Sequence, residues 1–440
     1  MVDLTAGALA GARPLARMPG LGQRLFWRGY DSALLGLTLM VMSDMPNRWG
    51  LASEVWLMVY GLFVLRAATV WRAFYRQAAR NWTLMLYPGV CLLSVIWSGS
   101  PVTSAVSGVQ MTMTVLIAMF LGWRFAPRQL VVTIWALLSL AALASLGNWA
   151  TGVFQPVYSD VGGLLGIYTS KNMLGHYSQF AAQISLTLML MGQGQAPRAA
   201  RWLAPLTLVL CVLAVALSKS MTAVLLLPLY GGLTLLLNRR RLPPLLRHGA
   251  IAALVLALSL GPLALAMAGI DPVAEVLRAT GKDATLTGRT ELWSIAYGLA
   301  SQAPLTGLGF GAFWAMDRYD SLHFAVIQAG ATAPSFHNFI ADVSVGTGLM
   351  GLGAMFALLG TVLSRALRHY RASGSALSVG CLILVLVPMN VGLLEPYLYR
   401  QHEFMLMWLV MLGVSIRSHL PPFVVPAPVR HESLDVNESR

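Results

Sequence analysis

Polar residues that could do chemistry are concentrated in residues 270–337, between long apolar runs. The ionisable side chains of this stretch are Asp271, Glu275, Arg278, Lys282, Asp283, Arg289, Glu291, Asp317, Arg318, Asp320, His323 and His337. A histidine in a model peptide titrates at about pH 6.5, so a neutral imidazole can take a proton from a hydroxyl group. A lone histidine is more often structural than catalytic, but the position of His337 makes it the stronger candidate of the two histidines in this stretch. It lies, followed by Asn338, where the charged stretch meets the next apolar run, and His323 has no such position.

The segment 287–293 could bind phosphate. Its sequence predicts the start of a helix, with Gly288 as the N-cap and Glu291 as the acidic residue three positions later. A helix N-terminus presents free N–H groups to an anion, and Arg289 adds a planar guanidinium that fits phosphate. The alternative is an arginine on the surface of an amphipathic loop helix, and the local sequence favours neither.

Two of the three lysines, Lys171 and Lys219, lie at the edges of apolar runs; the third is Lys282. Taken singly, each is better explained as an interfacial side chain whose ammonium group reaches water. Together with Arg289, they could form a cationic cluster that holds a diphosphate.

Motifs for nucleotides and metals are absent from the sequence. It contains no phosphate-binding Walker loop, no His-Glu-x-x-His pair and no dinucleotide glycine fingerprint, and the glycine run 307–311 predicts a turn. Cys91, Cys211 and Cys381 each fall inside an apolar run, so neither a metal cluster nor a disulfide framework is indicated. We therefore expect no cofactor and no metal, and a substrate that is already activated, such as a lipid-linked diphosphate.

The composition indicates the class of protein that must position these residues. The chain is 57% hydrophobic and 11% charged, whereas soluble domains carry about 25% charged residues. A net charge of +13 could suggest nucleic acid, but most arginines lie in short gaps between apolar runs, where they act as a topology signal. The sequence thus predicts a multi-pass membrane protein that contacts lipids and binds no nucleic acid.

Spans of about 20 apolar residues define the predicted architecture. We expect an all-α fold with about twelve transmembrane helices. The predicted spans are residues 30–46, 51–69, 82–98, 106–123, 129–147, 172–191, 202–218, 220–237, 249–269, 338–361, 376–393 and 403–418. Ser218-Lys219-Ser220 is the predicted break between two nearly continuous spans.

The distribution of Lys and Arg predicts the orientation. Alternate gaps between spans carry 22 cations on one side and 8 on the other, so both termini should be cytoplasmic. The predicted organisation is a cytoplasmic segment (1–29), the first nine spans (30–269), a large periplasmic loop with short helices (270–337), the last three spans (338–418) and a disordered cytoplasmic tail (419–440).

Several short motifs, in this order and with one large outer loop, resemble the O-antigen ligase and polymerase superfamily. They are Ser218-Lys219-Ser220, Thr287-Gly288-Arg289 with Trp293, the glycine run 307–311 and His337-Asn338. They cover roughly residues 160–345. The resemblance implies an all-helical fold and transfer of a glycan from undecaprenyl diphosphate without metal or nucleotide. It also implies that His337 is the catalytic base and that Arg289 holds the diphosphate. Lys219 stands where the family commonly has arginine, which keeps the charge but loses the bidentate fork.

The loop lengths favour the ligase branch of this superfamily. Polymerases of this superfamily tend to have two sizeable outer loops, whereas ligases have one. In this chain the outer gap 148–171 is much shorter than the outer loop 270–337. The expected enzyme joins O-antigen to lipid A–core oligosaccharide at the periplasmic face of a Gram-negative inner membrane. An O-antigen polymerase and a pilin oligosaccharyltransferase are the alternatives within the superfamily.

A transporter or flippase for lipid-linked sugars is the alternative from another class. Transporters place ionisable residues near the bilayer midplane, often on broken helices. Here the few acidic residues in or near spans, Glu54, Asp342 and Glu395, are interpreted as span ends, which favours an enzyme.

The predicted topology can be tested by cysteine labelling. In a background without the three native cysteines, a cysteine at Ala284 should react with an impermeant reagent from the periplasm. A cysteine at Ser433 should react only after the membrane is opened, because the tail is predicted to be cytoplasmic. Labelling of both positions from the same side would contradict the topology.

Overall fold

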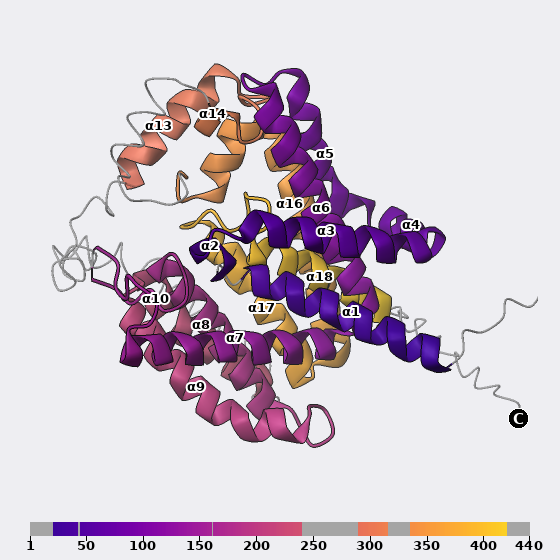
Figure 1. Ribbon diagram of the computed structural model, residues 1–440, viewed down its shortest axis with the longest axis vertical. Coiled ribbons are helices and arrows are strands. Elements are labelled where there is room, and N and C mark those ends of the chain that lie inside the picture. The colour runs from indigo at the N-terminus through magenta and orange to yellow at the C-terminus, as the bar shows by residue number, and fades with distance from the viewer. Residues whose placement is uncertain (1–20, 43–44, 161, 240–288, 316–334, 420–440) are drawn as a thin grey trace, which may run out of the picture.

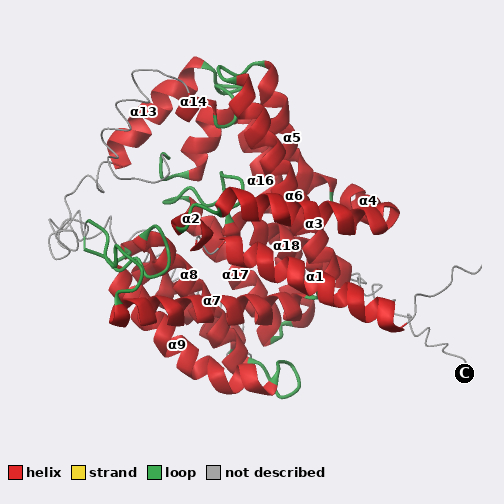
Figure 2. Ribbon diagram, viewed as in Figure 1, coloured by secondary structure: helices red, strands yellow, loops and turns green. Residues whose placement is uncertain are grey.

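The computed structural model of the chain describes residues 21–42, 45–160, 162–239, 289–315 and 335–419 (Figure 1). Every regular element within these ranges is a helix, and none of them contains a strand (Figure 2). The predicted all-α fold is therefore confirmed. The predicted span at 249–269, Gly288, His323 and the tail after residue 419 lie outside the described residues.

The helices follow the predicted spans closely. In chain order they are α1 (Leu21–Met42), α2 (Met45–Arg48), α3 (Ala52–Thr69), α4 (Trp71–Arg80), η1 (Trp82–Met85), α5 (Leu86–Leu93), η2 (Ser94–Ile96), α6 (Pro101–Arg124), α7 (Pro127–Thr151), α8 (Lys171–Leu190), α9 (Arg198–Ser218), α10 (Met221–Asn238), α13 (Arg289–Gln302), α14 (Ala312–Ala315), α16 (Phe339–Ser373), α17 (Ala376–Gly392) and α18 (Phe404–His419). Apart from residues 249–269, each predicted span coincides with a helical segment. Lys219 separates α9 from α10, as predicted.

Two helix boundaries differ most from the predicted spans. α1 begins at Leu21, within the segment 1–29 that was predicted to precede the first span. α16 continues to Ser373, past the predicted end of its span at residue 361. Arginines occupy both extensions, and arginine has a high helix propensity although it is unfavourable in lipid. Hydropathy therefore marks the membrane boundary and not the end of the helix.

The lengths and surfaces of the helices indicate a membrane protein. Six described helices are long and apolar enough to cross a membrane: α3, α6, α7, α9, α10 and α16. Residues 82–96, α17 and α18 form shorter apolar helices. Helix α9 exposes large apolar side chains, with Trp202 75% and Val209 64% exposed. Lipid can cover such surfaces, so the chain is a multi-pass membrane protein.

Helix α18 lies at the centre of the packed helices. Every residue from Phe404 to Ile416 is buried, which is typical of a helix that is apolar on all sides and surrounded by others. Trp408 is fully buried and its indole N–H donates to the Leu384 carbonyl of α17 at 2.7 Å. Gly122 of α6 allows the closest approach, because a Cβ there would lie 2.3 Å from the Met411 carbonyl oxygen.

Helix α16 is broken at Gly348, whose φ of +61° lies in the left-handed region. The next two N–H groups donate to the carbonyl oxygens of Pro304 and Leu305, at 2.9 and 3.1 Å. A Cβ at Gly348 would lie 2.5 Å from the Leu305 carbonyl carbon, so a larger residue does not fit. The break therefore satisfies its backbone groups by binding the segment that follows α13.

The glycine run 307–311 forms the predicted turn. Its three glycines have φ angles of +66°, +108° and +74°. The Gly309 N–H donates to the Gly346 carbonyl of α16 at 3.0 Å, and the Trp97 indole N–H donates to the Thr306 carbonyl at 2.9 Å. These bonds hold the turn between α16 and the corner that precedes α6.

Helix α13 packs on the same end of α16 through a small apolar core. The core contains Leu292, Ala296 and Leu299 of α13 together with Phe313, Phe336 and Val345. The spacing of the three α13 residues places them on one helical face. The stretch predicted as a loop thus carries helices docked beside the start of α16.

Replacing Gly122 with alanine should destabilise the protein, because the methyl group would meet backbone atoms of α18 that cannot move independently. Overpacking of this kind costs about 1–3 kcal/mol. Thermal unfolding of the purified protein in detergent measures the effect. The control is Gly147→Ala in α7, where a Cβ meets nothing within 4 Å. Equal melting temperatures for the two variants would contradict the assigned contact between α6 and α18.

Candidate functional site

His337 and Asn338 occupy the start of α16. Asn338 is the N-cap, and its side-chain oxygen accepts from two backbone N–H groups of the first turn, at 2.8 and 3.3 Å. His337 has a φ of +50°, which is rare for a residue with a side chain. The preceding N–H, of Phe336, donates to the buried Asp342 carboxylate at 3.1 Å. The cap and this bond fix the backbone on both sides of His337, so the strained conformation is held in place.

The imidazole of His337 is bonded to a buried carboxylate. Its Nδ1 lies 3.1 Å from Oε2 of Glu395, which is 3% exposed and belongs to the connection between α17 and α18. The other oxygen, Oε1, accepts from the side-chain amide of Asn172 at 2.9 Å. An ionised carboxylate only accepts hydrogen bonds, so an ionised Glu395 favours the tautomer with the proton on Nδ1, in which Nε2 could act as a base.

Glu395 and Asn172 are the site residues that the sequence did not reveal. Glu395 is separated from His337 by 58 residues and from Asn172 by 223, so no local pattern links them. Glu395 was instead interpreted as a span end. One signal was present, because an ionisable residue inside a membrane protein is a candidate functional residue.

The structure brings Lys171 and Lys219 together around one turn of the chain. A methyl group in place of the Gly162 hydrogen would lie 3.8 Å from the Lys219 Nζ. At Gly163 it would lie 2.5 Å from the Lys171 Cδ. Lys171 directly precedes Asn172, whose side chain donates to Glu395, at the start of α8.

Lys219 is held in an unusual backbone conformation. It ends α9 with a φ of +52°, and its side chain is exposed. The two residues that flank Lys219 pack closely on Gly175 of α8. A Cβ at Gly175 would lie 2.8 Å from the Ser218 Oγ and 2.6 Å from the Ser220 Cβ. The break between α9 and α10 therefore lies directly against the first turns of α8.

Arg289 is the first residue of α13, and its side chain is not among those described. One turn later, the indole N–H of Trp293 donates to the carbonyl of Phe336, the residue before His337, at 2.9 Å. The first turn of α13 therefore lies beside the start of α16. The role of the Arg289 side chain stays a prediction.

His402 is the third non-glycine residue with a positive φ in the described chain, and its surroundings differ from those of His337. Its ring stacks on Trp56 with centroids 4.0 Å apart, it is hydrogen-bonded to the Tyr60 hydroxyl, and its backbone N–H donates to Thr114 at 3.1 Å. Burial lowers the pKa of His402 to about 3, so it stays neutral. We assign His402 to the packing of α3 and α6 with the start of α18.

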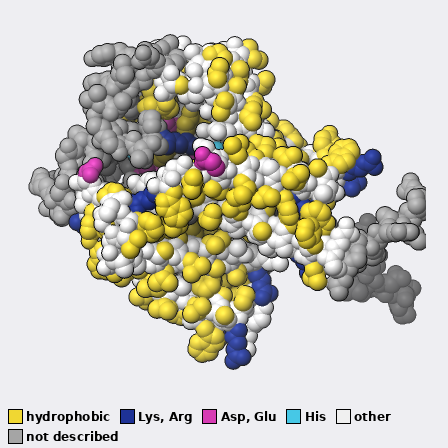
Figure 3. Space-filling model, in the orientation of Figure 1, with side chains coloured by type: hydrophobic (Ala, Val, Ile, Leu, Met, Phe, Trp, Pro, Cys, Tyr) yellow, Lys and Arg dark blue, Asp and Glu magenta, His cyan; other side chains and the backbone are white. Residues whose placement is uncertain are grey.

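Charged side chains gather in a hollow of the molecular surface. Figure 3 shows Lys or Arg, acidic and histidine side chains facing one another there, between the part that carries α13 and α14 and the part that carries α7 to α10. Within the described residues, no three His, Cys, Asp or Glu side chains are grouped as metal ligands would be. The arrangement can bind an anion and transfer a proton.

Two comparisons with known proteins found sequences similar to this chain. Residues 206–356, which contain Lys219, Arg289 and His337, match the family model described as O-antigen ligase. The exopolysaccharide production protein ExoQ of Rhizobium meliloti (strain 1021) is 29% identical to this chain over 384 residues, which cover 84% of this chain and 85% of that protein. The chain is thus similar to the O-antigen ligase family over residues 206–356, and to an exopolysaccharide production protein over most of its length.

Replacing Glu395 with glutamine should impair glycan transfer without loss of folding. A glutamine amide can donate to Nδ1, which would place the imidazole proton on Nε2 and remove the base. We expect turnover to fall about 10²-fold or more with little change in KM. The matched control is Glu54→Gln, at an exposed position in the first turn of α3. Turnover of Glu395→Gln equal to that of this control would contradict the orienting role.

Proposed function

We propose that this protein transfers a glycan from undecaprenyl diphosphate to an acceptor hydroxyl without metal or nucleotide. The observation that carries the proposal is the bond between His337 and the buried carboxylate of Glu395, beside two helix N-termini and two lysines. In the proposed step, the acceptor oxygen bonds to the anomeric carbon while the bond from that carbon to the diphosphate oxygen breaks. The acceptor proton passes to His337, and undecaprenyl diphosphate leaves.

His337 is the proposed general base. A sugar hydroxyl is a poor nucleophile unless its proton is removed as the new bond forms. The Glu395 carboxylate orients the ring and stabilises the positive charge that the imidazole acquires with the proton. Asn172, which donates to the same carboxylate, positions it for both roles. Asn338 supports the site as the N-cap that fixes the start of α16.

The cations are proposed to hold the diphosphate as negative charge develops on it. Arg289, Lys171 and Lys219 would supply the positive charge, and the first turns of α8 and α13 would supply N–H groups. Lysine at 219 acts as a point charge and lacks the bidentate fork. Gly288 precedes α13 and would let the diphosphate approach its first N–H groups.

The proposed acceptor is lipid A–core oligosaccharide at the periplasmic face of a Gram-negative inner membrane. The single long outer stretch 270–337 supports a ligase. Similarity to an exopolysaccharide production protein over most of the chain favours polymerisation as the second candidate.

One experiment separates these candidates. Purified protein is incubated with lipid-linked O-antigen, in chelator and without ATP, with or without lipid A–core. A ligase forms product only when lipid A–core is present, whereas a polymerase lengthens the lipid-linked glycan in its absence. Absence of both products would contradict the proposed glycan transfer.

Replacing His337 with alanine should nearly abolish transfer. Loss of a general base costs about 10²–10⁴-fold in turnover. The donor should still bind, because the cations remain, and the melting temperature should stay close to wild type.

The measurement is turnover with both substrates saturating, and His323→Ala is the control. The base assignment is wrong if folded His337→Ala turns over within about tenfold of wild type, the lower bound for such a base being about 10²-fold.

A further inference from the structure

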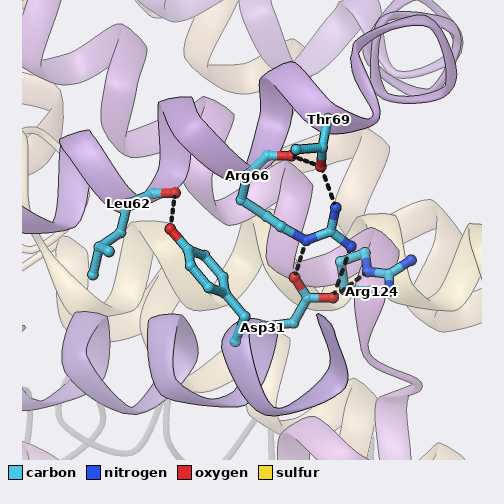
Figure 4. A network of polar contacts seen from close by, with 6 residues as sticks. Asp31, Leu62, Arg66, Thr69 and Arg124 are labelled. Atoms are coloured by element: carbon cyan, nitrogen blue, oxygen red, sulfur yellow. Dashed lines mark hydrogen bonds and ion pairs between the residues drawn. The ribbon is translucent and has the colours of Figure 1, made fainter. Parts of the chain in front are cut away.

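A buried carboxylate joins three helices at the end of the bundle remote from His337. Asp31 of α1 is 3% exposed and lies between two arginines (Figure 4). The Arg66 Nε of α3 lies 2.8 Å from one of its oxygens, and the Arg124 Nε of α6 lies 2.7 Å from the other. One carboxylate facing two guanidinium groups leaves an excess of positive charge.

The two arginines differ in how many of their N–H donors are available to a ligand. Arg66 is 3% exposed, also donates to Thr69 at 2.6 Å, and stacks over the Trp27 ring at 4.4 Å. Arg124 is 29% exposed, and within the described chain only its Nε makes a hydrogen bond. Its two terminal amino groups are therefore available, and Asp31 fixes the direction of the side chain.

Two neighbouring cavities open at these side chains. One has a volume of about 550 Å³, and its lining includes Arg28, Asp31, Arg124, Gln129 and His419. The other has a volume of about 560 Å³, and its lining includes Gln23, Trp27, Arg28, Arg66, Thr69 and Arg124. Arg28 and Arg124 line both. Since Asp31 is the one acidic residue among the described lining residues, the cavities fit an anion.

The surroundings place these cavities at the level of lipid headgroups. Helix α4 follows α3 after Val70, which lines the second cavity. It buries Phe74 and exposes Trp71 and Tyr75, which are 60% and 67% exposed, beside three arginines. Exposed Trp and Tyr beside arginines are typical of a helix that lies in the membrane interface. On α1, Phe26 is 62% exposed next to the residues that line the cavities.

We propose that this arginine pocket binds the phosphate group of an anionic membrane phospholipid. The guanidinium groups of Arg28 and Arg124 would bind the phosphate oxygens, for which their planar donors are suited. The ion pair of Asp31 with Arg66 would hold Arg124 in position. The exposed apolar residues of α1 and α4 would contact the acyl chains. This site is separate from the proposed glycan transfer and does not depend on it.

The test uses the full-length protein in an uncharged detergent at fixed ionic strength. It is titrated with short-chain phosphatidylglycerol, short-chain phosphatidylcholine or inorganic phosphate, and the melting temperature is followed, because a ligand that binds the folded state raises it. Arg28→Gln removes an exposed guanidinium that lines both cavities. Arg128→Gln is the control, because it removes an exposed arginine near the same end of the bundle that lines neither.

We expect phosphatidylglycerol to stabilise the wild type and the Arg128 variant, and phosphatidylcholine to stabilise neither. Arg28→Gln should weaken phosphatidylglycerol binding about tenfold, as expected for one charge-assisted hydrogen bond. Equal weakening of phosphatidylglycerol binding in the two variants would contradict the proposed pocket. It would show that the lipid responds only to the general surface charge. Stabilisation by inorganic phosphate as strong as that by the lipid would overturn the assignment to a phospholipid.

Discussion

The candidate site depends on the two hydrogen bonds that the Glu395 carboxylate makes with Asn172 and His337. A carboxylate that is 3% exposed at the edge of a membrane bundle is unfavourable unless its oxygens are paired. Asn172 occupies one oxygen and His337 the other, so the start of α8 and the start of α16 must meet at this point. Pairing a buried charge and orienting an imidazole are therefore achieved by the same contact.

Irregular backbone surrounds this pair, and each irregularity has a partner. In lipid, an unpaired N–H or carbonyl group is costly, so a broken helix needs another segment to satisfy it. The break at Gly348 is satisfied by Pro304 and Leu305. These contacts hold α13 on α16 and bring Trp293 within hydrogen-bonding distance of the Phe336 carbonyl. The position of α13 thus follows from this backbone pairing together with the apolar core that α13 forms with α16.

Features that depend on local sequence could be predicted, whereas pairings between distant residues could not. Apolar runs gave the spans, the glycines gave the turn at 307–311, and the polar interruption gave the break at Lys219. The extension of α1 to Leu21 was missed because hydropathy does not detect helical residues outside the membrane. The pairing of Glu395 with His337, and of Asp31 with Arg124, depends on how helices pack. No period in the sequence encodes such pairings.

Two of the three buried carboxylates in the described residues, Asp31 and Glu395, have partners of different charge, and this difference fits two different tasks. Asp31 faces two permanent cations, so its surroundings keep a positive excess that suits a bound anion. Glu395 accepts from the neutral Asn172 amide and is bonded to an imidazole that is charged only after it takes up a proton. Cations placed to hold a diphosphate would by themselves oppose protonation of a nearby histidine. A carboxylate bonded to Nδ1 offsets that repulsion, so a base and a cluster of cations can operate at the same end of the bundle.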